Sequence, residues 1–145
     1  MRRALSILAV LLGVVVIPVV AQSAADSAAI RETALNYVEG WYTGDAARME
    51  RALHPDLAKR IVRQGPQGSR LNSMTAAELV EGTRRGGGKD TPAEAQQKDV
   101  VILDVFQNAA SVRATMSGWV DYMHMARWNG EWRIVNVLWE LKPRG

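Results

Sequence analysis

Asp121 is the residue of this sequence with the clearest capacity for chemistry. It stands in the segment Trp119–Trp128, which is rich in aromatic and other apolar residues. The composition predicts a strand, in which Asp121 shares a face with Trp119 and Met123. A carboxylate on such a face is partly desolvated, which suits a general base or a ligand anchor. The alternative is a structural aspartate near a strand end, paired with an arginine or exposed.

His124 is the second candidate for a general base, because an imidazole titrates near neutral pH. Asp121 and His124 are three residues apart, so a regular strand places them on opposite faces. They cannot form an Asp–His pair unless a β-bulge lies between them. The alternative for His124 is a packed or interface histidine.

A hairpin turn at Asn129-Gly130 extends the face of Asp121 to the next strand. Both turn positions tolerate the positive φ of a type I′ turn. Trp128 then pairs with Glu131, and regular pairing beyond that places Arg127, Met125, Met123 and Asp121 opposite Trp132, Ile134, Asn136 and Leu138. Met123, Trp132 and Asn136 are therefore predicted to contact a ligand beside Asp121. The alternatives are apolar core for Trp132 and backbone pairing for the Asn136 amide.

Two aromatic residues of the first helix are the remaining ligand candidates. Tyr37 and Trp41 are four residues apart, so they lie on one side of a helix. Aromatic rings placed in this way can hold a flat ligand between them. Simple core packing is the alternative.

Composition excludes several classes of site. The chain has two histidines and no cysteine, which excludes disulfides, thiolate chemistry and a histidine-rich metal site. The glycines Gly86-Gly87-Gly88 follow an arginine rather than a strand, so they are expected to form a solvated loop and not a nucleotide-binding loop. No metal or cofactor is predicted.

The first 21 residues have the three parts of a secretory signal. Two arginines precede the uncharged apolar stretch Ala4–Ile17, and Val19-Val20-Ala21 supplies small residues for cleavage. We expect a signal peptide over 1–21, a linker over 22–27, one domain over 28–142, and a periplasmic or secreted protein without a membrane anchor after cleavage. The alternative is an uncleaved anchor, for which the apolar stretch is slightly short. Arg2 and Arg3 carry two of the three net positive charges, so the mature chain gives no support to nucleic-acid binding.

Helices come first in this chain and strands follow, which predicts an α+β fold rather than alternating βαβ units. Asp26 or Ser27 is the expected start of the first helix and Gly44 its end, while Leu57–Val62 fits a short strand or a helical turn. The other expected helices are 46–53 and 76–83, the second with a capping box at Thr75 and Glu78, and the expected strands are 99–106, 110–118, 119–128 and 131–141.

Both faces of the predicted sheet are substantially apolar. On one face of the last hairpin Val120, Tyr122 and His124 lie opposite Trp139, Val137 and Val135, while the other face carries Met123 and Trp132. In the first hairpin, with its turn at Gln107-Asn108, Val101, Leu103 and Val105 are expected to share a face with Val112 and Ala114. One face of the sheet covers the helices, and a second subunit is the simplest cover for the other. We therefore expect a homodimer through the sheet.

Four stretches of the sequence carry a family resemblance: Tyr37–Asp45, His54–Leu57, Trp119–His124 and Gly130–Trp139. They resemble the putative lumazine-binding family of the NTF2-like (SnoaL-like) superfamily, and the resemblance extends over about 28–141. It implies an NTF2-like cone, in which N-terminal helices pack on a curved, mostly antiparallel sheet and leave a cup between them. The superfamily includes isomerases, dehydratases and cyclases as well as non-catalytic binding proteins, and a shared fold does not establish shared chemistry.

We therefore expect an exported domain that binds a small, partly aromatic molecule in an apolar cup. Tyr37, Trp41, Met123 and Trp132 would supply contact area, and Asp121 and Asn136 would orient the ligand. Two alternatives remain open. One is an isomerase, dehydratase or cyclase that uses Asp121 or His124 as base, and the other is a non-catalytic interaction module that dimerises through its sheet.

Overall fold

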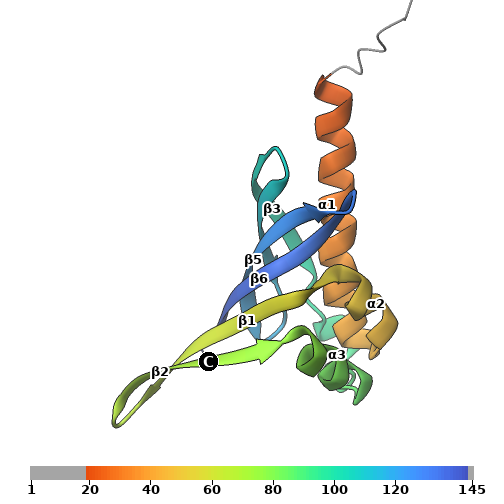
Figure 1. The fold of residues 1–145 in the computed structure, drawn as a ribbon. Coiled ribbons are helices and arrows are strands. Elements are labelled where there is room, and N and C mark those ends of the chain that lie inside the picture. Colours follow the sequence, from red (N-terminus) through yellow and green to blue (C-terminus); the bar gives the residue numbers. More distant parts are fainter. Residues whose placement is uncertain (1–18, 144–145) are drawn as a thin grey trace, which may run out of the picture.

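The computed structural model describes residues 19–143, in which helices pack against one curved six-stranded sheet (Figure 1). The predicted signal sequence falls on 1–21, of which 1–18 lie outside the described residues. Among the helices described, none has the length and apolar character needed to cross a membrane. The elements are α1 (Val19–Thr43), α2 (Ala46–Ala52), β1 (Leu53–Gly65), β2 (Gly68–Thr75), α3 (Ala76–Arg84), a 3₁₀ turn η1 (Ala93–Ala95), β3 (Asp99–Phe106), β4 (Ala109–Thr115), β5 (Trp119–Trp128) and β6 (Glu131–Leu141).

Helix α1 is longer than the sequence predicts. It is already helical at Val19, so Asp26 lies within it and the prediction of a cap at Asp26 or Ser27 is wrong. The Asp26 carboxylate instead pairs with the Arg127 guanidinium across to the sheet. Gly44, with φ of +72°, ends α1 as predicted, since glycine adopts this conformation without strain. The short helix α2 follows at once, and α3 begins with the predicted capping box of Thr75 and Glu78.

The sheet has the strand order β2-β1-β6-β5-β4-β3. All neighbours are antiparallel except β1 and β6, which run parallel. Leu57–Val62 therefore belongs to the long strand β1, and its partner β2 completes a hairpin that projects from the body of the molecule (Figure 1). The strand β2 is not predicted from its sequence, because its residues are mostly polar and exposed.

Both predicted hairpin turns are present in the second half of the chain. Gln107, Asn129 and Gly130 have φ of +50°, +49° and +84°, and the two turns join β3 to β4 and β5 to β6. Positive φ at Asn129 and Gly130 is the signature of the type I′ turn that Asn-Gly favours. The bounds of β3, β5 and β6 agree with the sequence prediction.

The pairing of β5 with β6 departs from the predicted register beyond Ile134. Near the turn, Met125 faces Ile134 as predicted, but the register shifts by one residue at Val135. Asn136 consequently pairs with His124 and not with Met123. A one-residue shift exchanges the faces of all later side chains. The predicted placement of Asn136 on the face of Asp121 is therefore wrong.

All residues of β6 after Val135 follow the shifted register. Leu138 pairs with Tyr122 on the outer face, and Trp139 pairs with Asp121 on the inner face. A similar shift at Leu103 in β3 leaves Val101 and Leu103 exposed and turns Val100 and Ile102 toward the helices. The expected grouping of Val101 and Leu103 with buried residues of β4 is therefore also wrong.

The hydrophobic core lies between α1 and the inner face of the sheet. Each strand of the meander contributes alternate residues to it, as expected for a sheet with one covered face. Its fully buried large side chains are Ile30, Tyr37, Val38, Met49, Val112, Met116, Met123, Met125, Ile134 and Val137.

Candidate functional site

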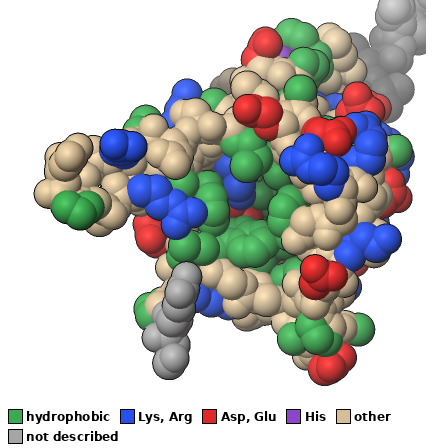
Figure 2. All heavy atoms as spheres, turned by 90° about the horizontal axis from the view of Figure 1, so that it is seen from below, with side chains coloured by type: hydrophobic (Ala, Val, Ile, Leu, Met, Phe, Trp, Pro, Cys, Tyr) green, Lys and Arg blue, Asp and Glu red, His purple; other side chains and the backbone are tan. Residues whose placement is uncertain are grey.

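The inner face of the sheet and the helices enclose an apolar cavity of about 190 Å³. Five elements besides α1 contribute to its wall, so it lies where the hairpin β1–β2, α3 and the ends of β5 and β6 meet. Figure 2, which views the molecule from the end where α2 and α3 lie, shows a hollow surrounded by hydrophobic side chains. The cavity is lined by Tyr37, Trp41, Lys59, Met74, Leu79, Trp119, Trp139 and Leu141.

Three tryptophans form the walls of this aromatic cavity. The rings of Trp41 and Trp119 meet edge to face, with centroids 5.9 Å apart and planes at 85°. Trp119 meets Trp139 in a similar way, at 6.1 Å and 71°. Edge-to-face contacts hold aromatic rings in defined orientations. The cavity therefore presents several aromatic surfaces at different angles to any molecule that enters it.

A buried polar cluster lies beside these rings. The Lys59 ammonium donates to Asp121 Oδ1 and, at 2.6 Å, to the Tyr37 hydroxyl. The Tyr37 hydroxyl and the Trp119 indole N–H donate to Asp121 Oδ2 at 3.1 and 2.8 Å. Asp121 is 0% exposed and Lys59 5% exposed. The carboxylate thus accepts three hydrogen bonds, and each donor belongs to a residue that lines the cavity.

Burial shifts the pKa values of two members of this cluster. Loss of hydration lowers the pKa of the Lys59 ammonium, and the negative charge of Asp121 opposes this change. The pKa of Tyr37 is raised well above its ordinary value, first by burial and then by the Asp121 charge and hydrogen bond. Tyr37 is therefore a neutral hydrogen-bond donor at physiological pH.

Lys59 also contacts aromatic faces at the cavity. Its Nζ lies 4.9 Å from the centroid of the Trp139 ring and 5.3 Å from that of Tyr37. Cation–π attraction of this kind is strongest where the cation is desolvated. An ammonium has three N–H donors, and the hydrogen bonds to Tyr37 and Asp121 use two of them.

A glycine-rich loop after α3 holds Trp41 in place. A Cβ added at Gly87 would lie 2.5 Å from Cη2 of the Trp41 ring, and one added at Gly88 would lie 2.5 Å from its Nε1. Real side chains do not tolerate such distances, so only glycine lets the loop backbone lie flat against the indole. The expectation of a solvated loop at Gly86–Gly88 is therefore confirmed only in part: Gly87 is exposed, whereas Gly88 is buried, and the loop packs against a wall of the cavity.

The structure brings together three of the residues that the sequence singled out. Tyr37 and Trp41 line the cavity from α1, and Asp121 lies directly behind its wall. Met123 and Trp132 are buried on the same inner face but do not line the cavity. Trp132 lies toward the other end of β6, where its indole N–H is 3.4 Å from Asp26.

Asn136 and His124 lie on the outer face of the sheet, away from the cavity. The Asn136 amide is 3.3 Å from His124 Nδ1 and accepts a hydrogen bond from Arg60 at 3.0 Å. Asp121 and His124 are thus on opposite faces, as predicted. Neither of the two candidate bases lines the cavity.

Lys59 and Trp139 belong to the site but were not predicted. The run Leu57-Ala58-Lys59-Arg60-Ile61 in β1 contains the signal for Lys59, because a lysine midway between two inward apolar positions of a strand must also face inward. Trp139 was placed on the outer face, because the register shift at Val135 has no clear mark in the sequence.

A metal site is not evident in the described part of the chain. Within residues 19–143, no group of three or more His, Asp or Glu side chains is arranged to hold an ion. The buried cluster itself has one carboxylate, a hydroxyl and an ammonium, and the ammonium would repel a cation.

Similarity to known sequences covers almost the whole described chain. The model of the family described as "Putative lumazine-binding" matches residues 25–140. The chain belongs to this family. No curated protein sequence matches it significantly.

Several solved structures share the fold of this member of the putative lumazine-binding family. An NTF2-like protein of unknown function from Shewanella baltica is 20% identical, with a TM-score of 0.64 over 83% of this chain and 97% of its own. One from Methylobacillus flagellatus is 21% identical, with a TM-score of 0.62 over 82% and 94%. An NTF2-like protein with a cystatin-like fold from Novosphingobium aromaticivorans is 15% identical, with a TM-score of 0.64 over 86% and 87%. At these identities the likeness establishes the NTF2-like fold.

Proposed function

We propose that this protein binds a small planar molecule in the aromatic cavity, through ring contacts with Trp41, Trp119 and Trp139. The observation that carries this proposal is the combination of three tryptophan walls with one buried ammonium. Apolar pockets with a few fixed polar groups are typical of small-molecule sites. The family's description supports the same class of ligand.

The size of the cavity limits the ligand. A cavity of about 150 Å³ with apolar walls is large enough to bind benzene, and this one is about 190 Å³. One ring or a small fused pair fits, and larger substituents must extend toward the open side. A lumazine ring system is within this range.

Lys59 supplies the orientation of the bound ring. Its third N–H is available to an acceptor such as a ring carbonyl oxygen, while Asp121 holds the ammonium in position from behind. Asp121 is in this arrangement a positioning residue, because its oxygens already accept hydrogen bonds from Lys59, Tyr37 and Trp119. Binding is therefore better supported than catalysis with Asp121 or His124 as base.

Replacement of Trp139 by leucine tests the proposal, with lumazine as probe. Loss of one aromatic wall is expected to weaken lumazine binding about tenfold, which is the upper range of a single ring contact. Titration monitored by calorimetry measures the affinity. Trp128→Leu is the matched control, because Trp128 is exposed and contacts His54 outside the cavity. Equal affinities for both variants, or no binding of lumazine or other planar rings by the wild type, would contradict the proposal.

We also propose that two copies of the chain associate through the outer face of the sheet. Tyr122 and Leu138, 48% and 50% exposed, pair with each other at its centre, and Val101 lies in the same row beyond Arg113. This row thus has three exposed apolar side chains interrupted by one arginine, and such a surface favours contact with a partner.

Leu138→Lys is expected to convert this dimer to monomers, since association would then bury an ammonium beside Arg60, its like-charged neighbour on β1. Light scattering coupled to gel filtration at micromolar concentration measures the mass. Ala77→Lys on the exposed side of α3 is the control and is expected to leave the mass unchanged. A wild-type protein that is monomeric under these conditions would overturn the proposal.

A further inference from the structure

The concave side of the hairpin β1–β2 continues the aromatic cavity toward solvent. Three successive pairs face this side: Lys59 with Met74, Ile61 with Asn72, and Arg63 with Arg70. From Lys59 to Arg63 the strand advances about 13 Å. Along this side of the hairpin the cavity-lining pair comes first, and the pair with the apolar Ile61 comes next. The last pair consists of two arginines directly opposite each other.

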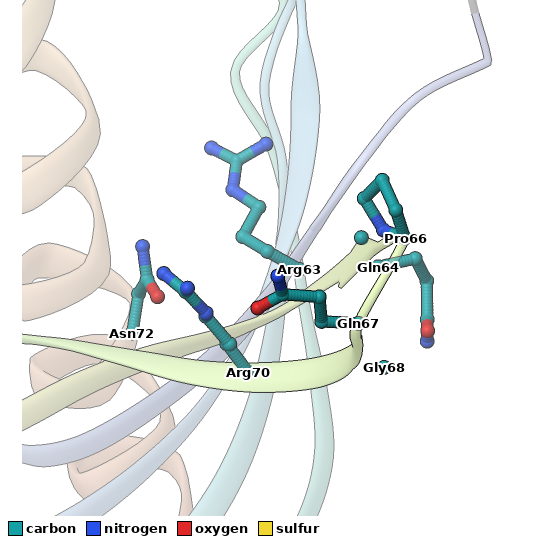
Figure 3. A pocket seen from close by; sticks show the side chains of 8 residues that line it. Arg63, Gln64, Pro66, Gln67, Gly68, Arg70 and Asn72 are labelled. Atoms are coloured by element: carbon teal, nitrogen blue, oxygen red, sulfur yellow. The ribbon is translucent and has the colours of Figure 1, made fainter.

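The two arginines lie beside an open hollow of about 470 Å³ at the end of the hairpin. Figure 3 shows the side chains of Arg63, Arg70 and Asn72 leaving the two strands toward the same side. In Figure 2, basic side chains lie on the projecting hairpin next to the hydrophobic hollow. The arginines therefore present their guanidinium groups to one shared space.

Arg63 connects this space with the aromatic cavity. Its Cζ lies 5.5 Å from the centroid of the Trp139 ring, and Lys59, four residues earlier on the same face of β1, lies over the same ring. A molecule that stacks in the cavity would consequently have the Arg63 guanidinium at its outer edge. Only a short spacer is needed between the ring and a group that reaches the arginines.

Apart from the contact of Arg63 with Trp139, the placement of the two arginines opposite each other does not contribute to stability. Like charges directly opposite each other on neighbouring strands destabilise a sheet. Within residues 19–143, neither Arg63 nor Arg70 takes part in an ion pair with an acidic side chain. An anion between the two guanidinium groups would relieve the repulsion, and the planar fork of arginine suits a carboxylate or a phosphate.

We propose that Arg63 and Arg70 bind the anionic group of the ligand whose ring occupies the aromatic cavity. The ligand class is then a small aromatic acid, with a carboxylate or phosphate group one to a few bonds from the ring. This inference rests on the proposed function, because it assigns the charge of the same ligand.

Three probes of similar size test this inference by calorimetry with the purified protein. Indole-3-acetate carries a carboxylate, 3-indoxyl phosphate carries a phosphate, and indole-3-acetamide is neutral. At low salt we expect at least one anion to bind about tenfold more tightly than the amide, and the advantage to shrink as salt screens the exposed arginines. The stronger of the two anions identifies the group that the site prefers.

Arg70→Gln and the double variant Arg63→Gln/Arg70→Gln are expected to remove this advantage. Arg70→Gln, whose side chain does not line the aromatic cavity, is expected to leave amide affinity within about twofold. Unchanged amide binding shows that the cavity is intact in that variant. Arg51→Gln, which removes the same charge from an exposed position of α2, is expected to keep the advantage. If both anions bind no better than the amide, or if the arginine variants keep the preference, this inference fails while ring binding stands. If none of the probes binds, this inference and the proposed ring binding both fail.

Discussion

Lys59→Met is expected to lower the free energy of unfolding by about 3–5 kcal/mol, the usual cost of breaking a buried ion pair from one side. Methionine has nearly the length of lysine, so the packing volume is largely kept. The loss arises because Asp121, 0% exposed, keeps its charge without the cation that faces it. Urea unfolding monitored by tryptophan fluorescence measures the change.

The double variant Lys59→Met/Asp121→Asn is expected to recover most of this loss. It removes both charges together, while the asparagine side-chain oxygen can still accept hydrogen bonds from Tyr37 and Trp119. The control is Arg84→Met, which breaks an exposed pair with Glu81 and is expected to cost no more than about 1 kcal/mol. A Lys59→Met variant as stable as Arg84→Met would contradict the description of a desolvated pair.

The pH dependence of stability offers a second readout of Lys59. Because burial lowers its pKa below the ordinary 10.5, the folded protein binds fewer protons than the unfolded chain between the folded-state pKa and 10.5. The free energy of unfolding therefore gains with rising pH in that window, and the gain is lost as pH falls through the folded-state pKa. Lys59→Met should lack this contribution. Tyr37, with its raised pKa, acts in the opposite direction only above its ordinary value of 10.0.

The strands β3 to β6 and the turns within the two hairpins can largely be predicted from local sequence patterns. Asn129-Gly130 requires a tight turn, and once the turn is placed the first pairs of β5 and β6 follow from it. The family resemblance supplied the relation of the helices to the sheet. The pairing of β1 with β6 is different, since it joins segments far apart in the chain and no local pattern specifies it.

The candidate site was predicted only in part, and the reason is one residue of register. Tyr37 and Trp41 follow from helical spacing, and Asp121 from its apolar neighbours. Trp139 was wrongly assigned to the outer face, because the shift at Val135 turns its side chain inward. Asn136 was wrongly included in the site for the same reason. Bulges depend on the curvature that the whole sheet adopts, so residues beyond them are assigned to the wrong face by simple alternation.

Gly88→Ala is expected to destabilise the protein by about 1–3 kcal/mol, the usual cost of forcing an extra methyl into a packed site. The new Cβ would lie 2.5 Å from both the Nε1 and the main-chain oxygen of Trp41. A rotation of the indole relieves only the first of these contacts, so the loop backbone must also move. Gly118→Ala is the matched control, because a Cβ added there would meet nothing within 4 Å, and it is expected to stay within about 0.5 kcal/mol of the wild type.

The same substitution is expected to weaken lumazine binding, because a displaced Trp41 ring enters the cavity that it normally borders. A double-mutant cycle with Trp41→Leu separates the two contacts of the new methyl group. If the indole collision dominates, Gly88→Ala costs clearly less stability in the Trp41→Leu background than in the wild type. If the main-chain oxygen dominates, the cost is the same in both backgrounds and the ring is held by the rest of the loop. Binding that survives Gly88→Ala unchanged would show that the glycine-rich loop does not position Trp41 for the ligand.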